Sequence, residues 1–509
     1  MDKSLSFPQF PESYWRATAN SPEFPALQED ITTDVAIVGG GISGITTAYL
    51  LTEAGLKVTL LEAGKLMNGT TGHTTAKITA QHDLIYDELI SKNGEEKAKL
   101  YYQANHEALA FISSIVHQNG LDCGFSEQDA YIYTNDETYI DKLERELAAY
   151  EKLGIPRDYV ASIPLNIPAR AAIVMKNQGQ FHPLHYLNHL INRIVQGGGQ
   201  IFEHTTAIDI DHGSRQVIIT REGHRVTSSH VAVCTHFPFY DGISMYFARL
   251  HAERSYVLGV KAAQPYPGGM YLSAEDPKRS IRSTKLPEGS ELLIIGGQNH
   301  KSGQGICTFE HYEALQSFTA ATFGEAEIAY RWSAQDLTTI DNIPYTGQIR
   351  SSTPHIFVAT GYRKWGMTNG TASAILLRDL ILDKDSPYAE LYNPSRGISA
   401  AGWKELIVEN VDVAKHLIAG KLEMIHKRAE DLAPDEGCVV THHGKRAGAY
   451  KDKQGQLHLV DTTCTHMGCE VEWNNGDRTW DCPCHGSRFA VSGEVVEGPA
   501  ERPLKKLKL

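Results

Sequence analysis

A glycine-rich turn between an apolar run and a helical pattern constrains the fold of this 509-residue chain more than any other feature. Residues 33–38, TDVAIV, are a short apolar run that predicts a buried parallel strand. ISGITTAYLLTEAG (42–55) follows with helical periodicity and a closing glycine, and KVTLLEAG (57–64) predicts a second strand. Strand, helix and strand in this order form a βαβ unit, the building block of parallel α/β sheets.

The turn inside this unit has the spacing that dinucleotide binding requires. Gly39, Gly41 and Gly44 form G-x-G-x-x-G, and Glu62 ends the second predicted strand. The first glycine permits the tight turn, the second lets a pyrophosphate approach the backbone, and the third lets helix and strand pack closely. The helix N-terminus offers N–H groups to the phosphates, and Glu62 would accept hydrogen bonds from the ribose hydroxyls. The motif predicts a dinucleotide site without distinguishing NAD from FAD.

Longer stretches of the first 400 residues resemble the D-amino-acid oxidase superfamily. They are residues 34–80, RWSAQDLTTIDNIPYTGQI (331–349) and FVATGYRKWGMTNGTASAILLRDLI (357–381). The nearest branch is the glycine oxidase, sarcosine oxidase and gamma-glutamylputrescine oxidoreductase group. The resemblance implies FAD as the cofactor, an α/β Rossmann-like FAD-binding fold with a two-layer α+β substrate subdomain, and a small amine or amino acid as substrate.

The same resemblance implies residues around the flavin. A strand at IFVAT (356–360) followed by a helix would direct a helix N-terminus at the pyrimidine edge, where its dipole favours the negative charge of the reduced ring. Relatives line the isoalloxazine with the stretch that matches GTTGHTTAKIT (69–79). The candidate flavin-binding residues implied here are Thr74, Thr75, Gly361, Gly366 and Met367.

Three residues are candidates for catalysis. Lys77 would lie near the flavin, with a solvated surface position as the alternative. Arg282 falls about where amino-acid oxidases hold the substrate carboxylate, although surface exposure is an equal expectation. Trp365 replaces a small or polar group that relatives carry beside the ring, so the substrate pocket is expected to differ from theirs.

The cysteines are unevenly distributed. Cys123, Cys234 and Cys307 are scattered and predict inert core positions. The other five of the eight lie within the last 72 residues, and in a cytosolic protein such crowding indicates metal binding before disulfides. Cys464-x-His466 and Cys482-x-x-His485 predict two short loops that hold a metal from two sides, and zinc would satisfy this ligand count.

The fuller pattern CTHMGC … CPCHGS resembles the Rieske proteins, over about residues 433–509. It implies a 2Fe–2S cluster with Cys464 and Cys482 on one iron and His466 and His485 on the other. Cys469 and Cys484 match the pair that forms a disulfide between the two loops in cytochrome bc-type domains.

The Rieske resemblance also bears on the reduction potential of the cluster. GPAERPL (498–504) matches the third loop that covers the cluster. Ser487 stands where high-potential relatives carry a serine that donates a hydrogen bond to the cluster or its ligands, but Phe489 stands in place of their tyrosine. The potential is therefore expected below that of the bc-type proteins.

The chain is expected to divide into an N-terminal extension (1–30), the flavin domain (31–402), a helical connector (403–432) and a small all-β Rieske domain (433–509). A net charge of −13 argues against nucleic acid as a partner, since phosphate binding needs clustered positive charge. The chain lacks an apolar run of membrane-spanning length, and its N-terminus lacks a signal-peptide pattern. These features predict a cytoplasmic protein without a transmembrane segment.

Flavin and cluster on one chain predict an electron relay. The first hypothesis is a FAD-dependent dehydrogenase that oxidises CH–NH to C=N in an amine or amino acid and passes electrons singly to the cluster, then to an unknown protein or quinone. A second is an oxidase that uses oxygen directly, with the Rieske domain as a sensor or structural module. A third is a non-catalytic electron-transfer component of an oxygenase system. The substrate class rests on family resemblance alone.

Overall fold

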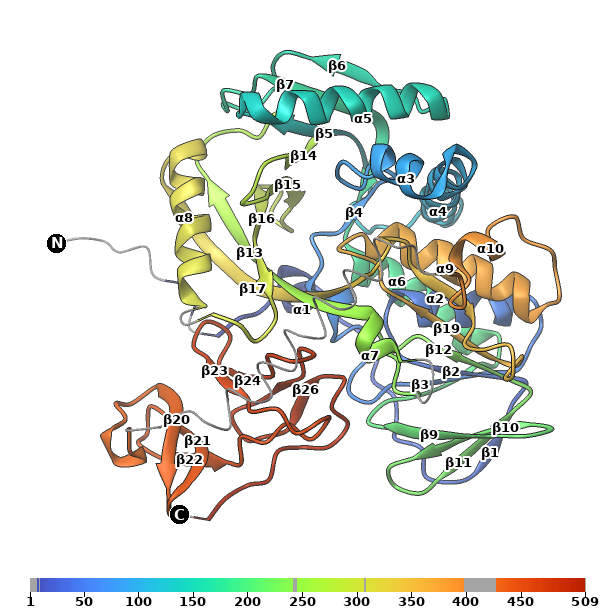
Figure 1. The fold of residues 1–509 in the computed structure, drawn as a ribbon, viewed down its shortest axis with the longest axis vertical. Coiled ribbons are helices and arrows are strands. Elements are labelled where there is room, and N and C mark those ends of the chain that lie inside the picture. The colour runs from blue at the N-terminus through green and yellow to red at the C-terminus, as the bar shows by residue number, and fades with distance from the viewer. Residues whose placement is uncertain (1–6, 9, 241–244, 306–307, 398–426, 509) are drawn as a thin grey trace.

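The computed structural model describes residues 7–8, 10–240, 245–305, 308–397 and 427–508 (Figure 1). The expected connector 403–432 falls outside these ranges up to residue 426, and so does Cys307. In the part of the chain that is described, no helix is both long enough and apolar enough to cross a membrane.

The predicted βαβ unit is present at the centre of a six-stranded sheet with the order β18-β19-β12-β2-β3-β8. All its strands are parallel except β18. Their bounds are β2 Val35–Val38, β3 Val58–Leu61, β8 Gln200–Phe202, β12 His230–Val233, β18 Tyr345–Gln348 and β19 Ile356–Thr360. Helix α2 (Ile42–Glu53) packs between α6 (Pro183–Gln196) and α9 (Gly366–Ile381).

Alternation along β2 explains the layers around this sheet. Val35 and Ile37 are buried in the cluster that includes the residues of α2 and α6, whereas Ala36 and Val38 belong to a second cluster. That second cluster joins the sheet to a smaller sheet of order β1-β11-β10-β9. Its strands are β1 Ile31–Thr32, β9 Ala207–His212, β10 Gln216–Thr220 and β11 Arg225–Ser228.

A second large sheet forms the expected substrate subdomain, with strand order β17-β13-β16-β15-β14-β5-β7-β4 and β6 paired to β7. The bounds are β4 Lys77–Ile78, β5 Ser126–Thr134, β6 Asp158–Val160, β7 Ala171–Gln180, β13 Leu250–Ala262, β14 Met270–Ser273, β15 Arg279–Lys285, β16 Glu291–Lys301 and β17 Ala326–Thr339. Its helices are α3 Tyr86–Asn93, α4 Glu95–Asn119, α5 Ile140–Leu153 and α8 Phe309–Phe323, with short turns at α7 Tyr246–Arg249 and α10 Ala389–Tyr392.

The N-terminal residues support the loop that precedes β4. Trp15, on the short helix α1 (Tyr14–Thr18), is fully buried and donates from Nε1 to the carbonyl oxygen of Thr74 at 2.7 Å. Trp332 of β17 donates in the same way to the carbonyl oxygen of His73 at 2.8 Å. Two buried indoles therefore fix the short helix η1 (Thr70–His73) and the residues after it.

The C-terminal residues form the expected small all-β domain, which lies beside β13, β17 and the start of α8 (Figure 1). One sheet contains β20 Glu436–His442, β21 Lys445–Lys451 and β22 Leu457–Val460. The other contains β23 Glu472–Asn474, β24 Thr479–Asp481, β25 Arg488–Phe489 and β26 Val495–Glu497. The domain has two apolar clusters among its described residues. The predicted ligand loops, 464–469 and 482–487, pack in the cluster that contains Trp480 and Phe489.

Candidate cofactor sites

The glycine turn between β2 and α2 has the geometry expected of a nucleotide loop. Gly39 has φ of 108°, and a Cβ there would lie 2.4 Å from the carbonyl oxygen of Cys234. At Gly44 a Cβ would lie 1.9 Å from the carbonyl oxygen of Gly39, so this glycine permits the close contact of helix and strand. Gly41 lines a cavity as the N-cap of α2, and a Cβ there would lie 3.2 Å from Thr71 Oγ1. The Ile42 N–H donates to Thr71 Oγ1 at 3.0 Å, and the cavity lies at this helix N-terminus, where the helix dipole favours an anionic ligand.

Glu62 is held in place by this loop. Its Oε2 accepts a hydrogen bond from the Gly40 N–H at 2.8 Å, and its Oε1 accepts one from the Gly64 N–H at 2.8 Å. Burial raises the pKa of Glu62, and both backbone bonds oppose that shift. The carboxylate lines the same cavity as Gly41, at the end of β3 where a ribose would lie.

The cavity has a volume of about 950 Å³, at the upper end of the range for small-molecule sites. Its wall brings together most of the predicted flavin-binding residues: Gly39, Gly41, Glu62, Thr74, Thr75, Gly366 and Met367. Gly44 and Gly361 are not in the wall, because Gly44 lies in the helix–strand contact and Gly361 packs toward Thr339. The glycine cradle, the position of the α2 N-terminus at the cavity and the volume all fit a dinucleotide such as FAD.

Lys77 and Arg282 occupy different positions relative to the cavity. Lys77 lines it, is 9 % exposed, and donates from Nζ to the carbonyl oxygen of Tyr271 at 2.8 Å. Burial, and then the charge of Arg282, lower the pKa of Lys77 to about 7. Arg282 lies behind the cavity wall, where Nη1 donates to the carbonyl oxygen of Ala76 at 2.7 Å and the guanidinium lies 5.2 Å from the Trp15 ring.

Trp365 is the N-cap residue of α9, and its ring stacks on that of the buried His82. Its ring centroid lies 4.8 Å from that of His82, with an interplanar angle of 18°. The two residues before it, Arg363 and Lys364, have positive φ values of 46° and 66° and also line the cavity. Strained backbone of this kind gathers at functional sites. Sequence reasoning missed both residues, although the departure RKWGM from the family pattern marked their position.

Arg363 and Lys364 are held differently. Nη2 of Arg363 donates to the carbonyl oxygen of His82 at 2.8 Å, and Arg363 lines the cavity. Nζ of Lys364 lies 2.8 Å from Oε2 of Glu253 in an ion pair. Glu253 also lines the cavity and offsets the charge of Lys364, so Arg363 is the cation that the loop before α9 adds next to Trp365.

The four predicted cluster ligands converge in the C-terminal domain. The thiols of Cys464 and Cys482 are hydrogen-bonded, which lowers the pKa of Cys464 and raises that of Cys482. The His466 and His485 rings lie 5.0 Å apart, and both Nδ1 atoms are buried without a hydrogen-bond partner. Buried nitrogens normally find partners, so two such atoms beside two thiols fit a metal centre with two sulfur and two nitrogen ligands.

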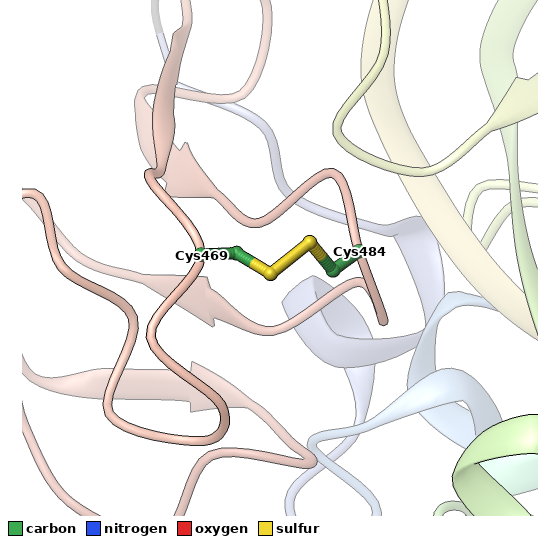
Figure 2. The surroundings of a disulfide bond; sticks show 2 residues. All are labelled: Cys469 and Cys484. Carbon is green, nitrogen blue, oxygen red and sulfur yellow. A yellow bond between two sulfur atoms is a disulfide. The ribbon is translucent and has the colours of Figure 1, made fainter. Parts of the chain in front are cut away.

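Two further features surround these ligands. Ser487 is fully buried and its side chain hydrogen-bonds Cys464, while Phe489 is fully buried in the apolar core of the domain. Cys469 and Cys484 form a disulfide that joins the two ligand loops (Figure 2). The bond leaves Cys464 and Cys482 as the free thiols of the two loops.

Fold and sites together define a flavin-dependent oxidoreductase joined to an iron–sulfur domain, and comparison with known proteins agrees. The family described as FAD dependent oxidoreductase (DAO) matches residues 34–380, and the Rieske 2Fe-2S domain family matches residues 423–508. The chain belongs to the DAO family of FAD-dependent oxidoreductases and carries a C-terminal Rieske 2Fe-2S domain. Both resemblances predicted from the sequence are confirmed, as are the two cofactors that they imply.

Individual relatives match either almost the whole chain or about 72 % of it. YhfW of Bacillus subtilis (strain 168), which is named as a Rieske 2Fe-2S iron-sulfur protein, is 52 % identical over 98 % of this chain and 98 % of its own length. Gamma-glutamylputrescine oxidoreductase of Escherichia coli (strain K12) is 24 % identical over 72 % of this chain and 88 % of its own. The crystal structure of glycine oxidase from Geobacillus kaustophilus matches 72 % of this chain and 100 % of that one, with a TM-score of 0.62 and 20 % identity, and shares the fold.

Proposed function

We propose that this protein oxidises a small amine or amino acid, CH–NH to C=N, and passes the electrons one at a time from FAD to its Rieske cluster. When bound, FAD accepts two electrons from the substrate, and the cluster conducts them singly to an external protein or quinone. The names of the relatives, gamma-glutamylputrescine oxidoreductase and glycine oxidase, support this substrate class.

One observation carries the relay: the C-terminal domain forms part of the cavity wall. Residues 494–501 and Pro503 line the same cavity as Gly41 and Glu62. Phe237, from the flavin domain, lines the cavity and also packs edge-on against His466, with ring centroids 6.0 Å apart. Phe247 contacts His485 in the same way at 6.2 Å. A module that only stabilised the fold would not need both histidines packed against aromatic rings of the flavin domain, one of which lines the cavity.

We assign the residues that serve the two cofactors as follows. Gly39, Gly41, Gly44 and Glu62 hold the nucleotide, and the N-terminus of α9 faces the flavin ring. The other flavin-binding residues of the proposal are Thr74, Thr75, Gly366 and Met367, whereas Gly361 shapes the turn before α9 from outside the wall. Cys464, His466, Cys482 and His485 hold the cluster.

For the substrate, we propose that Lys77, Arg363 and Trp365 form the binding wall. Arg363 replaces Arg282 as the candidate for a substrate carboxylate, since Arg282 has its guanidinium against Ala76 and Trp15, outside the cavity wall. A neutral fraction of Lys77 near pH 7 would let its amine take a proton from a substrate ammonium.

An anaerobic titration tests the relay. Primary and secondary amines and amino acids are added without oxygen, and the flavin and cluster absorbance bands are followed together. Bleaching of both bands by one substrate is the expected result. Bleaching of the flavin alone, with rapid peroxide formation once air is admitted, would instead establish that the protein is an oxidase that uses oxygen directly. The Rieske domain would then be a sensor or a structural module.

A further inference from the structure

The interface between the C-terminal domain and the flavin domain contains buried charged groups. Asp477, in the turn between β23 and β24, accepts a hydrogen bond from Tyr312 Oη of α8 at 2.8 Å and another from Ser333 of β17. Arg488 of β25 donates to Asp477 at 2.8 Å. Burial alone would raise the pKa of Asp477, but the Arg488 and Arg254 guanidinium groups lower it to about 2. The ionised carboxylate is therefore fully partnered only while the two domains are in contact.

Arg254 makes the reciprocal contact from the flavin domain. It lies on β13, is 1 % exposed, and donates from Nη2 to Oε2 of Glu497 at 3.0 Å. The same guanidinium donates to Ser333 Oγ at 2.9 Å and to Gln335 Oε1 at 3.2 Å. One buried cation thus links β26 of the cluster domain to β17 of the flavin domain, and undocking would leave both sides with unmatched charge.

Three glycines allow the two domains to lie in close contact, because a Cβ at any of them would clash with the other domain. A Cβ on Gly303 would lie 2.5 Å from the carbonyl carbon of the ligand Cys482. On Gly476 it would lie 2.9 Å from Thr308 Oγ1, and on Gly486 it would lie 2.4 Å from Gln335 Oε1. Each contact crosses the interface, and two of them touch the loop that carries Cys482 and His485.

Gln335 connects the two cofactor loops directly. Its carbonyl oxygen accepts a hydrogen bond from Thr70 Oγ1 at 2.8 Å, and Thr70 begins the η1 segment that lines the cavity. Its side chain packs on Gly486, which follows the ligand His485 in the chain. A single residue of β17 therefore touches the cavity loop on one side and the cluster loop on the other.

We propose that the cluster domain stays docked on the flavin domain throughout turnover, and that Gln335 is the positioning residue that fixes the cluster loop relative to the flavin loop. The inference rests on the proposed relay. In the step concerned, reduced FAD loses one electron and one ferric iron of the cluster becomes ferrous, and the external acceptor restores the ferric iron. Because the interface is already closed, no domain movement precedes this transfer.

The first test uses the wild-type protein. One electron is delivered to the bound flavin by anaerobic flash photoreduction with 5-deazaflavin, and the growth of the reduced-cluster signal is timed in buffers of increasing sucrose concentration. A docked pair gives a transfer rate that is independent of viscosity. A rate that falls in proportion to viscosity overturns the docking proposal while leaving the relay intact. No transfer at all would overturn the relay itself.

A matched pair of variants tests the contact. Gly303→Ala introduces a Cβ against Cys482, whereas Gly305→Ala lies in the same loop at φ of 111° with open space around its Cβ. Transfer should slow by roughly tenfold or more in Gly303→Ala, because small misplacements of reacting groups are costly, and stay near the wild-type rate in Gly305→Ala. Equal rates in the two variants, at full FAD and iron content, would contradict the proposal.

Gln335→Ala provides the decisive second measurement if Gly303→Ala loses its cluster. It removes the side chain that packs on Gly486 and accepts the Arg254 Nη2 hydrogen bond, and it leaves the backbone bond to Thr70. The expected result is slower transfer with an unchanged cluster midpoint potential and an unchanged EPR spectrum. A wild-type transfer rate in this variant would show that Gln335 does not position the loop.

Discussion

The cluster pocket and the dinucleotide cavity are built in opposite ways. All four proposed cluster ligands come from two loops that lie between Cys464 and His485, and the loops are tied to each other by one disulfide. The cavity collects its wall from segments spread between Val38 and Pro503, including the far domain. A compact site of this kind depends on a few irreplaceable atoms. A distributed site depends on the docking of large elements and tolerates most single changes.

The largest expected effect is loss of the cluster when one ligand sulfur atom is replaced by oxygen. Cys482→Ser should remove all iron, because a thiolate ligand has no substitute in the pocket, while FAD remains bound. Cys438→Ser is the control, since Cys438 lies in the same domain on β20 and outside the ligand loops. Iron and FAD analysis of the purified proteins measures both. Equal loss of flavin would show that the two sites are not independent.

A side chain at the glycine cradle should be almost as damaging to the cavity. Gly41→Val places its branched side chain where the pyrophosphate approaches the backbone, so the purified protein should be largely free of FAD. Gly213→Val is the control, because Gly213 also lacks a positive φ and has its nearest neighbour at 3.9 Å. The ratio of flavin to protein absorbance reports the result. Full flavin content in Gly41→Val would remove this loop from the site.

A pH effect of intermediate size is expected at Lys77. Its pKa of about 7 in the folded protein lies below its ordinary 10.5, so between these values the unfolded chain binds the extra proton and the stability rises with pH. Relative to Lys77→Met, wild type should gain a few kcal/mol from pH 7 to pH 10, since each pKa unit is worth about 1.4 kcal/mol.

Denaturant unfolding at several pH values measures this effect. The exposed lysine variant Lys57→Met is the control and should show no comparable change. A difference between wild type and Lys77→Met that is independent of pH would mean that Lys77 is solvated, contrary to its position in the cavity wall.

The smallest effect concerns the reduction potential of the cluster. Phe489→Tyr would add a hydroxyl at a fully buried position near the ligands, and a new hydrogen bond to sulfur favours the more negative reduced cluster. A bond worth about 1 kcal/mol shifts a one-electron potential upward by on the order of 40 mV. Ser487→Ala should lower the potential, because it removes the bond to Cys464. Voltammetry showing Phe489→Tyr unchanged or lower, with the cluster intact, would refute this account.

Local motifs allowed the sequence to predict both cofactors and the loops proposed to hold them. Gly39 has a positive φ, and a Cβ on Gly44 would lie 1.9 Å from the carbonyl oxygen of Gly39. Both positions therefore require glycine, and the sequence shows the two glycines at the spacing of the motif. The ligand loops are equally local, so the pairing of Cys469 with Cys484 could be expected from the family pattern.

The contacts between the two domains leave no local motif in the sequence from which they could be predicted. Arg254 and Glu497 are 243 positions apart, and nothing near either residue marks the pair. The position of Arg282 could not be predicted either, because placing it against the substrate depended on a loose alignment and not on a spacing. Arg363 lay inside a recognised block, but only the structure shows that it lines the cavity, in a loop where its φ is 46°.

The buried polar contacts that cross the interface have a consequence for how such a chain can be altered. A Rieske domain taken from another protein would keep its ligands and still fail to fit unless it also supplied Asp477 and Glu497, because Arg254 and Tyr312 would otherwise lose their partners across the interface. Gene fusion alone would therefore not create a working pair of this kind. The two halves have to be inherited, or engineered, as one unit.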